Sequence, residues 1–261
     1  MHLTNMTPLL PALLYLSVAV FLIGMGWRWW VWLRTPVPLK IVLTPAPQNA
    51  SGVVRRLAEE ILGFRSVFEA DRLLWIPAWL FHVSLLWLLA GHVCGLVIPD
   101  YTESFLLLDD TQFERLAQVA GSIVGGLAFA ALLCLLLRRL AAERLRWIST
   151  FSDYFALVLL LLILGTGNHL RFMGGLDLAQ ARAFVSGWLA LRPVAAPANP
   201  VFLAHVLFVS ALLIFIPFSK LVHLGGGALF SPTLNQRNDP RERRHLNPRE
   251  AVRSTVGQPH P

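Results

Sequence analysis

The chain has 261 residues, of which 56% are hydrophobic and 14% charged, and its mean hydropathy is +0.60. Soluble globular domains carry about a quarter charged residues, so this composition excludes an ordinary soluble protein and indicates a membrane protein. The net charge of +7 does not indicate a nucleic-acid partner, because the basic residues cluster beside the apolar segments.

Five apolar segments are long enough to cross a membrane as helices, which takes about 20 mostly apolar residues. No basic residue precedes the first segment, which indicates a retained span and not a cleaved signal peptide. The sequence therefore predicts an all-α bundle of five transmembrane helices, forming one domain over 1–225 with a basic tail over 226–261. The expected spans are 8–33, 75–98, 116–137, 151–172 and 200–222.

The basic residues of the loops predict the orientation of this bundle, because cytoplasmic loops are enriched in Lys and Arg. Six basic residues follow the first span, the segment 138–146 holds four arginines, and the tail after Leu224 holds six. The segment 99–115 is instead acidic, with Arg115 as its only base. We therefore expect the N-terminus outside, the C-terminus inside and a cytoplasmic tail.

The first cytoplasmic loop contains a short amphipathic pattern. Ser51 to Phe64 (SGVVRRLAEEILGF) places apolar residues at helical spacing opposite a polar face. This predicts a helix on the membrane surface or against a partner, and a solvated connector helix is the alternative.

Two of the spans carry pairs of histidines. FHVSLLWLLAGHV at 81–93 contains His82 and His92, and the run 204–224 contains His205 and His223. Ionisable side chains at membrane depth are costly and indicate functional sites. The two spans run in opposite directions, so the first histidine of one span and the second histidine of the other lie at similar depth in the membrane. Pairing the histidines by depth joins His82 with His223 and His92 with His205.

An imidazole from each of two antiparallel helices can supply both axial ligands of a low-spin haem b. The chain has no CxxCH motif for covalent attachment, so we predict two non-covalent haem b groups. Ten residues place His82 and His92 roughly 80° apart around a helix, so helix tilt or a kink at Pro217 has to help align the pairs. The alternative is a haem-free proton-relay transporter or membrane anchor.

These motifs resemble those of the γ subunit of respiratory nitrate reductase. FHVSLLWLLAGHV matches its FHxxxxxxxxGH pattern, IPFSKLVH at 216–223 is similar to its FPFSRLVH, and YLSVAVFLIGMGWR at 15–28 is similar to its first span. The resemblance implies five helices, two haem b groups and quinol oxidation on the outer side. His92 and His205 would hold the outer haem, and His82 and His223 the inner haem nearer a cytoplasmic partner.

The C-terminal tail resembles a narrower group within that family. LFSPTLNQRNDPRERRHLNP at 229–248 is similar to the tail of the DsrM-type membrane cytochrome b of the dissimilatory sulfite-reductase-linked complex, DsrMKJOP. This implies a bacterial or archaeal cytoplasmic (inner) membrane, a cytoplasmic iron–sulfur partner of heterodisulfide-reductase type, and further membrane and periplasmic cytochrome subunits. A basic segment resting on anionic lipid is the alternative. The candidate partner-binding residues of the tail are Asn238, Asp239, Arg241, Arg243, Arg244 and His245.

The resemblance also implies quinone or quinol as substrate, as the electron donor or the acceptor. A lysine before the third span contributes to quinol binding in the nitrate-reductase relatives, but here the region is DDTQFERLAQVAG, without lysine. Arg115 is the nearest basic residue, and Gln112 or Glu114 could take hydrogen-bonding or proton-transfer roles. Gly91 would let a ring approach the backbone, and His169 could contact a quinone or a haem propionate or have a structural role.

Overall fold

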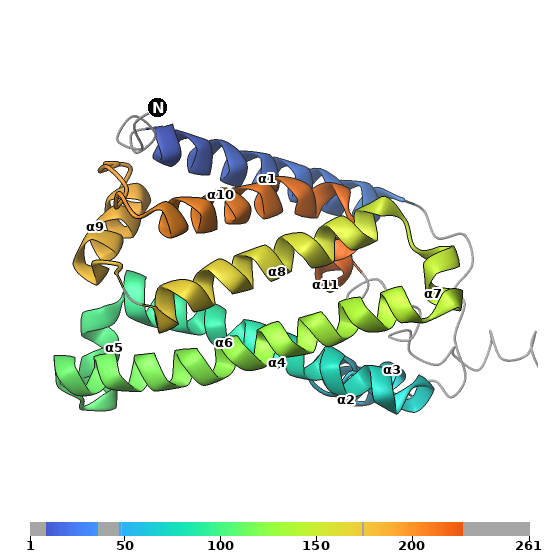
Figure 1. The fold of residues 1–261 in the computed structure, drawn as a ribbon. Helices are drawn as coiled ribbons and strands as arrows, with labels where there is room; N and C mark the ends of the chain where they lie inside the picture. Colours follow the sequence, from blue (N-terminus) through green and yellow to red (C-terminus); the bar gives the residue numbers. More distant parts are fainter. Residues whose placement is uncertain (1–8, 36–46, 48, 174, 227–261) are drawn as a thin grey trace, which may run out of the picture. The chain divides into compact units, whose positions relative to one another are not determined.

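The computed structural model describes residues 9–35, 47, 49–173 and 175–226 (Figure 1). The chain divides into two compact units. Unit 1 comprises 1–28 and 66–222, and unit 2 comprises 29–65 and 223–261. Residues 227–261 of the expected tail lie outside the described residues, so the boundary between bundle and tail stays a prediction.

Five helices are long and apolar enough to cross a membrane, at Leu9–Arg34, Arg72–Val97, Thr111–Ala141, Phe151–Phe172 and Pro200–Phe218. The prediction of an all-α, five-span, multi-pass membrane protein is thus confirmed for the described residues. The orientation of the termini stays a prediction. In order, the spans belong to α1 (Leu9–Arg34), α4 (Arg72–His92) with the π-helix η2 (Val93–Val97), α6 (Asp110–Ala141), α8 (Phe151–Phe172), and α10 (Pro200–Phe215) with the 3-10 helix η3 (Ile216–Phe218).

Shorter helices connect the spans. The amphipathic pattern of 51–64 forms α2 (Ala50–Gly63), capped by the Asn49 side chain, which accepts a hydrogen bond from the amide of Gly52. The predicted helix is therefore confirmed, while its place on a membrane or partner stays a prediction. The remaining short helices are α3 (Arg65–Ala70), α5 (Pro99–Leu106), α7 (Glu143–Ile148), α9 (Leu178–Leu189), η4 (Lys220–Val222) and α11 (His223–Gly226).

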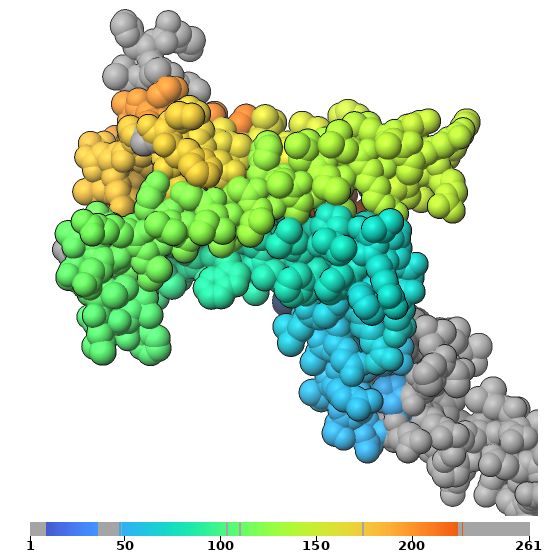
Figure 2. Space-filling view, turned by 60° about the horizontal axis from the view of Figure 1, so that its bottom comes forward, coloured from blue at the N-terminus to red at the C-terminus, as the bar shows by residue number. Residues whose placement is uncertain are grey.

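Within unit 1, α6 packs against both α4 and α8, and α8 packs against α10 (Figure 1). Figure 2 shows the outer surface of α6 as a green to yellow-green band. Large apolar side chains are exposed along this helix at steps of three, four and six residues, which keeps them on one face and gives α6 an apolar stripe suited to lipid contact. They include Leu116, Val119, Ile123, Leu127, Leu133 and Leu137.

The first span, α1, packs against the last span, α10 with η3, through residues that lie a multiple of seven apart on both spans. Leu10 packs with Leu203 at one end, and Gly24 faces Pro217 at the other. By the same step, Ser17 and Ser210 fall between these layers, and both are buried. A seven-residue repeat keeps one face of a helix toward its neighbour, and small residues on that face let the backbones approach closely.

We expect Gly24→Ala to destabilise the packing of α1 on α10. A Cβ at this position would lie 2.6 Å from Cβ and 2.9 Å from Cγ of Pro217, whose ring cannot rotate away. Overpacking of this kind costs about 1–3 kcal/mol. Thermal unfolding in detergent measures the effect, and Gly26→Ala is the control because nothing lies within 4 Å of its Cβ. Equal melting temperatures for the two variants would contradict the close contact.

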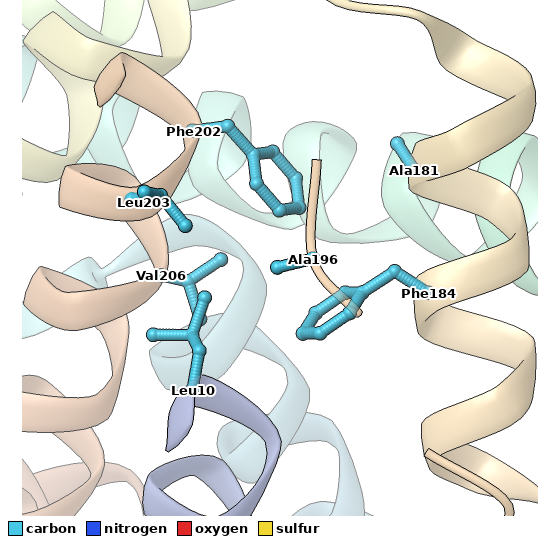
Figure 3. Packing of buried hydrophobic residues seen from close by; sticks show 7 residues of the cluster. All are labelled: Leu10, Ala181, Phe184, Ala196, Phe202, Leu203 and Val206. Atoms are coloured by element: carbon cyan, nitrogen blue, oxygen red, sulfur yellow. The ribbon is translucent and has the colours of Figure 1, made fainter. Parts of the chain in front are cut away.

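One end of the α1–α10 seam is covered by α9 (Figure 3). Phe184 of α9 is 2% exposed and meets the ring of Phe202 edge to face at 5.7 Å. The hydroxyl of Tyr15 donates a 2.7 Å hydrogen bond to the carbonyl of Trp188. The α8–α10 connection is therefore a packed element, which the sequence did not predict. The buried cluster consists of Leu10, Ala181, Phe184, Ala196, Phe202, Leu203 and Val206.

The last span ends earlier than expected. The α-helix stops at Phe215, a 3-10 turn carries Pro217, and Ser219 has extended backbone (φ −121°, ψ 177°). Proline lacks the N–H that would continue the α-helical ladder, so the predicted span 200–222 is wrong at its end and closes at Phe218. The Nε of Arg28 donates a 2.9 Å hydrogen bond to the carbonyl of Pro217 and ties the break to α1.

Asp71 joins the start of α4 to the end of α6. Its carboxylate accepts a 3.0 Å hydrogen bond from the amide of Leu74, which caps α4, and lies 2.7 Å from Nη2 of Arg138. The backbone hydrogen bond from Leu74 is the largest cause that lowers the pKa of Asp71, and Arg138 lowers it further. The ionised form is therefore favoured in the folded protein.

This pKa shift predicts how Asp71→Asn changes stability with pH. Asparagine keeps the cap but loses the charge, so the variant is less stable than wild type near neutral pH. The pKa of Asp71 is lower in the folded protein than its ordinary value of 3.8. The carboxylate therefore stabilises the fold above pH 3.8, and this stabilisation is lost as the pH falls through the pKa of the folded protein. Unfolding measured along an acid series should show the difference between the two proteins shrinking below 3.8. A difference that does not change with pH would contradict the ionic role.

Candidate functional site

Two of the predicted haem ligands face each other across unit 1. His92 is the last residue of α4, and His205 lies in the second turn of α10. Their imidazole rings are parallel within 5°, with centroids 6.4 Å apart. The structure thus brings together a pair that the sequence predicted from depth order.

The hydrogen bonds of His92 and His205 define which nitrogen is available to a metal. Nδ1 of His92 lies 2.7 Å from the carbonyl oxygen of Leu88. A carbonyl only accepts, so this Nδ1 carries the proton and Nε2 carries the lone pair. Nδ1 of His205 is likewise engaged, 3.0 Å from the hydroxyl oxygen of Thr166.

The spacing of the two rings fits one metal ion between them. An imidazole nitrogen binds a transition metal at about 2 Å. Two imidazoles whose Nε2 atoms bind the same ion from opposite sides therefore have their ring centroids about 6 Å apart. No group of three or more His, Cys, Asp or Glu side chains is arranged to hold a metal within the described part of the chain. A pair of opposed imidazoles is the ligand set that bis-histidine haem proteins use for porphyrin iron.

His82 lies ten residues earlier on α4 and is partly buried. Its Nδ1–H donates to the carbonyl oxygen of Ala78 at 2.7 Å, and its ring meets that of Phe81 edge to face at 5.1 Å. The hydrogen bond leaves the lone pair on Nε2, as in His92. His223 is the first residue of α11 and belongs to unit 2. The pairing of His82 with His223 stays a prediction.

The segment that leads to His223 is held by the carboxylate of Asp153. Asp153 near the start of α8 is 9% exposed, and its Oδ2 lies 2.9 Å from Nζ of Lys220 and 3.5 Å from Nη1 of Arg139. The same oxygen accepts a 2.8 Å hydrogen bond from the amide of Thr150 and so closes a capping box. Asp153 thereby connects α8 with η4 and with the end of α6.

The candidate quinone residues lie at separate positions. Gly91 is exposed, and a Cβ atom at this position would have no other atom within 4 Å. Gln112 completes the capping box of α6, since its side chain accepts from the amide of Asp109 at 3.2 Å. Arg115 on α6 and His169 on α8 are exposed. Among the described residues no hydrogen bond or ion pair joins two of these four candidates, and their role stays a prediction.

Sequence reasoning missed a polar strip between α8 and its neighbours. Besides Thr166, it includes Asn168, whose Nδ2 donates a 3.1 Å hydrogen bond to the carbonyl of Gly125, and Arg171, whose Nη1 donates a 3.1 Å hydrogen bond to Gln118. The run GTGNHLRF in an otherwise apolar span was the available signal. The candidate tail residues 238, 239, 241 and 243–245 lie outside the described residues.

Five apolar helices and a facing imidazole pair define a multi-pass membrane protein with a candidate bis-histidine metal site. A sequence profile described as the nitrate reductase gamma subunit matches residues 52–233. The chain therefore belongs to the nitrate reductase gamma subunit family.

Individual relatives agree with this assignment. The chain is 34% identical over 272 residues to the Hdr-like menaquinol oxidoreductase cytochrome b-like subunit of Archaeoglobus fulgidus, covering 90% of this chain and 81% of that protein. The protein of the same name from Archaeoglobus profundus is 31% identical, with 91% and 81% covered. The nitrate reductase gamma chain of Bacillus subtilis is 32% identical over 156 residues, with 56% and 69% covered.

Proposed function

We propose that this chain is the membrane cytochrome b subunit of a quinol-linked oxidoreductase, transferring electrons between the quinone pool and a partner subunit. The observation that carries the proposal is the parallel arrangement of His92 and His205 at 6.4 Å, which fits axial ligation of one iron. The Archaeoglobus relatives, named as cytochrome b-like subunits of menaquinol oxidoreductases, support it.

The four histidines would hold two haem b groups, one between His92 and His205 and one between His82 and His223. A haem held by these histidines would supply reversible one-electron transfer. The chain contributes the orientation of its imidazoles through the Nδ1 hydrogen bonds of His82, His92 and His205. Phe81 and Leu164 belong to a buried apolar cluster in the interior of unit 1.

Quinol oxidation or quinone reduction is assigned to the outer side, near Gly91. The Gln112 side chain is engaged in helix capping, so Arg115 and His169, which are exposed, are the preferred candidates for contact with a quinone head group. An Arg side chain donates hydrogen bonds, whereas a neutral imidazole can also accept one. This division would let His169 accept a proton from a quinol hydroxyl while Arg115 orients the ring.

The partner is proposed to be a cytoplasmic iron–sulfur subunit of heterodisulfide-reductase type, within a DsrMKJOP-like complex of sulfur metabolism that includes other membrane and periplasmic cytochrome subunits. The two Archaeoglobus names support an Hdr-like assembly. In this proposal the N-terminus lies outside, and the basic tail 226–261 meets the partner on the inside of the cytoplasmic membrane. The alternative is a γ subunit of respiratory nitrate reductase, which the Bacillus subtilis relative supports over a shorter segment.

A dithionite-reduced minus oxidised absorbance spectrum of the purified, folded chain tests the haem assignment. We expect the α-band of b-type haem and two haems per chain. A flat spectrum would reject the cytochrome assignment in favour of a haem-free proton-relay transporter or membrane anchor.

Co-purification from the native membrane tests the partner. An iron–sulfur subunit together with a periplasmic multihaem cytochrome supports the sulfur-linked complex. A molybdenum subunit in the same preparation would instead support the nitrate reductase alternative.

A further inference from the structure

His205 differs from His82 and His92 in what its Nδ1 contacts. In His82 and His92, Nδ1 lies 2.7 Å from the backbone carbonyl four residues earlier in the same helix. In His205 it lies 3.0 Å from the side-chain hydroxyl of Thr166, which belongs to α8 and not to α10. The orientation of this one imidazole therefore depends on groups of another helix, α8, among which Thr166 supplies a side-chain contact.

The hydroxyl of Thr166 is arranged to accept a hydrogen bond from His205. Its single proton is directed to the carbonyl of Leu162 at 2.7 Å, with the carbonyl of Ile163 at 3.0 Å. The oxygen lone pairs are then left for a donor, and the Nδ1–H of His205 is that donor. This selects the tautomer of His205 whose lone pair is on Nε2, the same tautomer that the Leu88 carbonyl selects in His92.

The backbone of α8 also seats the ring of His205. A Cβ on Gly167 would lie 3.3 Å from Cε1 of His205, so the bare glycine lets the imidazole rest close to the helix. Thr166 and Gly167 together hold the ring from one side while it stays parallel to His92 within 5°. Both features act on the ring orientation that an axial ligand requires.

We infer that Thr166 is a positioning residue for the outer haem, acting through the tautomer and orientation of His205. This inference rests on the proposed function, because it concerns how the chain holds the haem assigned to His92 and His205. Hydrogen-bond partners of a metal-bound histidine typically contribute 10- to 100-fold to metal affinity. Loss of the hydroxyl is therefore expected to weaken the outer haem without removing either ligand.

The test compares Thr166→Val with Thr166→Ser in the purified full-length chain. Valine keeps the shape of threonine and removes the hydrogen bond, whereas serine keeps the hydroxyl. We expect the valine variant to hold the outer haem at least about tenfold more weakly in haem titration and to shift its low-spin EPR signal. The serine variant should resemble wild type, and the inner haem should be unchanged in both.

Ser210→Ala is the matched control. Ser210 lies on α10 five residues after His205, is 1% exposed, and its hydroxyl has no hydrogen-bond partner among the described residues. Removing it deletes a buried hydroxyl from the same helix without touching the imidazole. Both haem signals should stay as in wild type.

Three outcomes would overturn the inference. Wild-type haem affinity and an unchanged EPR signal in Thr166→Val would show that the hydroxyl does not position His205. Equal loss in Thr166→Ser would assign the effect to the methyl group. A wild-type protein that binds no haem would overturn the proposed function itself, and this result is distinct from the other two.

Discussion

Replacing His205 with alanine is expected to remove one of the two b-type haem signals and leave the other. The substitution deletes one of the two imidazoles that face each other at 6.4 Å, so a haem between them would lose an axial ligand. The His82/His223 site does not use His205 and should remain. Redox titration of the reduced-minus-oxidised spectrum counts the haems in the variant, and His92→Ala should lose the same component.

His169→Ala is the control for this experiment. His169 is an exposed histidine on α8 and is not one of the proposed ligands. Its replacement should leave both haem components in place, even if quinol oxidation slows. The proposed pairing would be wrong if His205→Ala retained both components, or if His92→Ala and His205→Ala removed different ones.

Asp153→Asn is expected to lower the stability of the protein and to weaken the inner haem. The variant removes the anion shared by Lys220 and Arg139, while the amide can still cap α8. Breaking an ion pair costs about 3–5 kcal/mol where the pair is buried and about 1 kcal/mol or less where it is exposed. The Asp153 side chain is 9% exposed and that of Lys220 is 70% exposed, so we expect an intermediate loss of about 2 kcal/mol. Since Lys220 precedes His223 by three residues, the inner haem should be weakened more than the outer haem.

Thermal unfolding in detergent and haem titration measure the two effects of Asp153→Asn. Asp109→Asn is the matched control, because Asp109 also closes a capping box and has no ion pair among the described residues. It should change neither the melting temperature nor the inner haem appreciably. A selective loss of the outer haem in Asp153→Asn would contradict the link between this carboxylate and the His223 segment.

The sequence predicted the spans well because membrane insertion depends on the length of apolar segments, which is a local property. The spans at 8–33 and 151–172 were placed within one residue at each end. The ends were wrong where capping or proline intervened. Asp109 starts α6 ahead of the apolar run, and Pro217 ends α10 before the run is finished.

The sequence by itself determined the all-α, five-span class, because apolar length decides which segments can cross a membrane. It also predicted, from the alternating direction of successive spans, that His92 lies beside His205, and the two rings do lie side by side. The tertiary structure decided what surrounds that pair. Thr166 contacts His205, and Asp153 contacts Lys220. Which side chains face each other in this way depends on how each helix is rotated about its own axis. That rotation is set by close contacts between helices, such as Gly24 against Pro217, which apolar length does not encode.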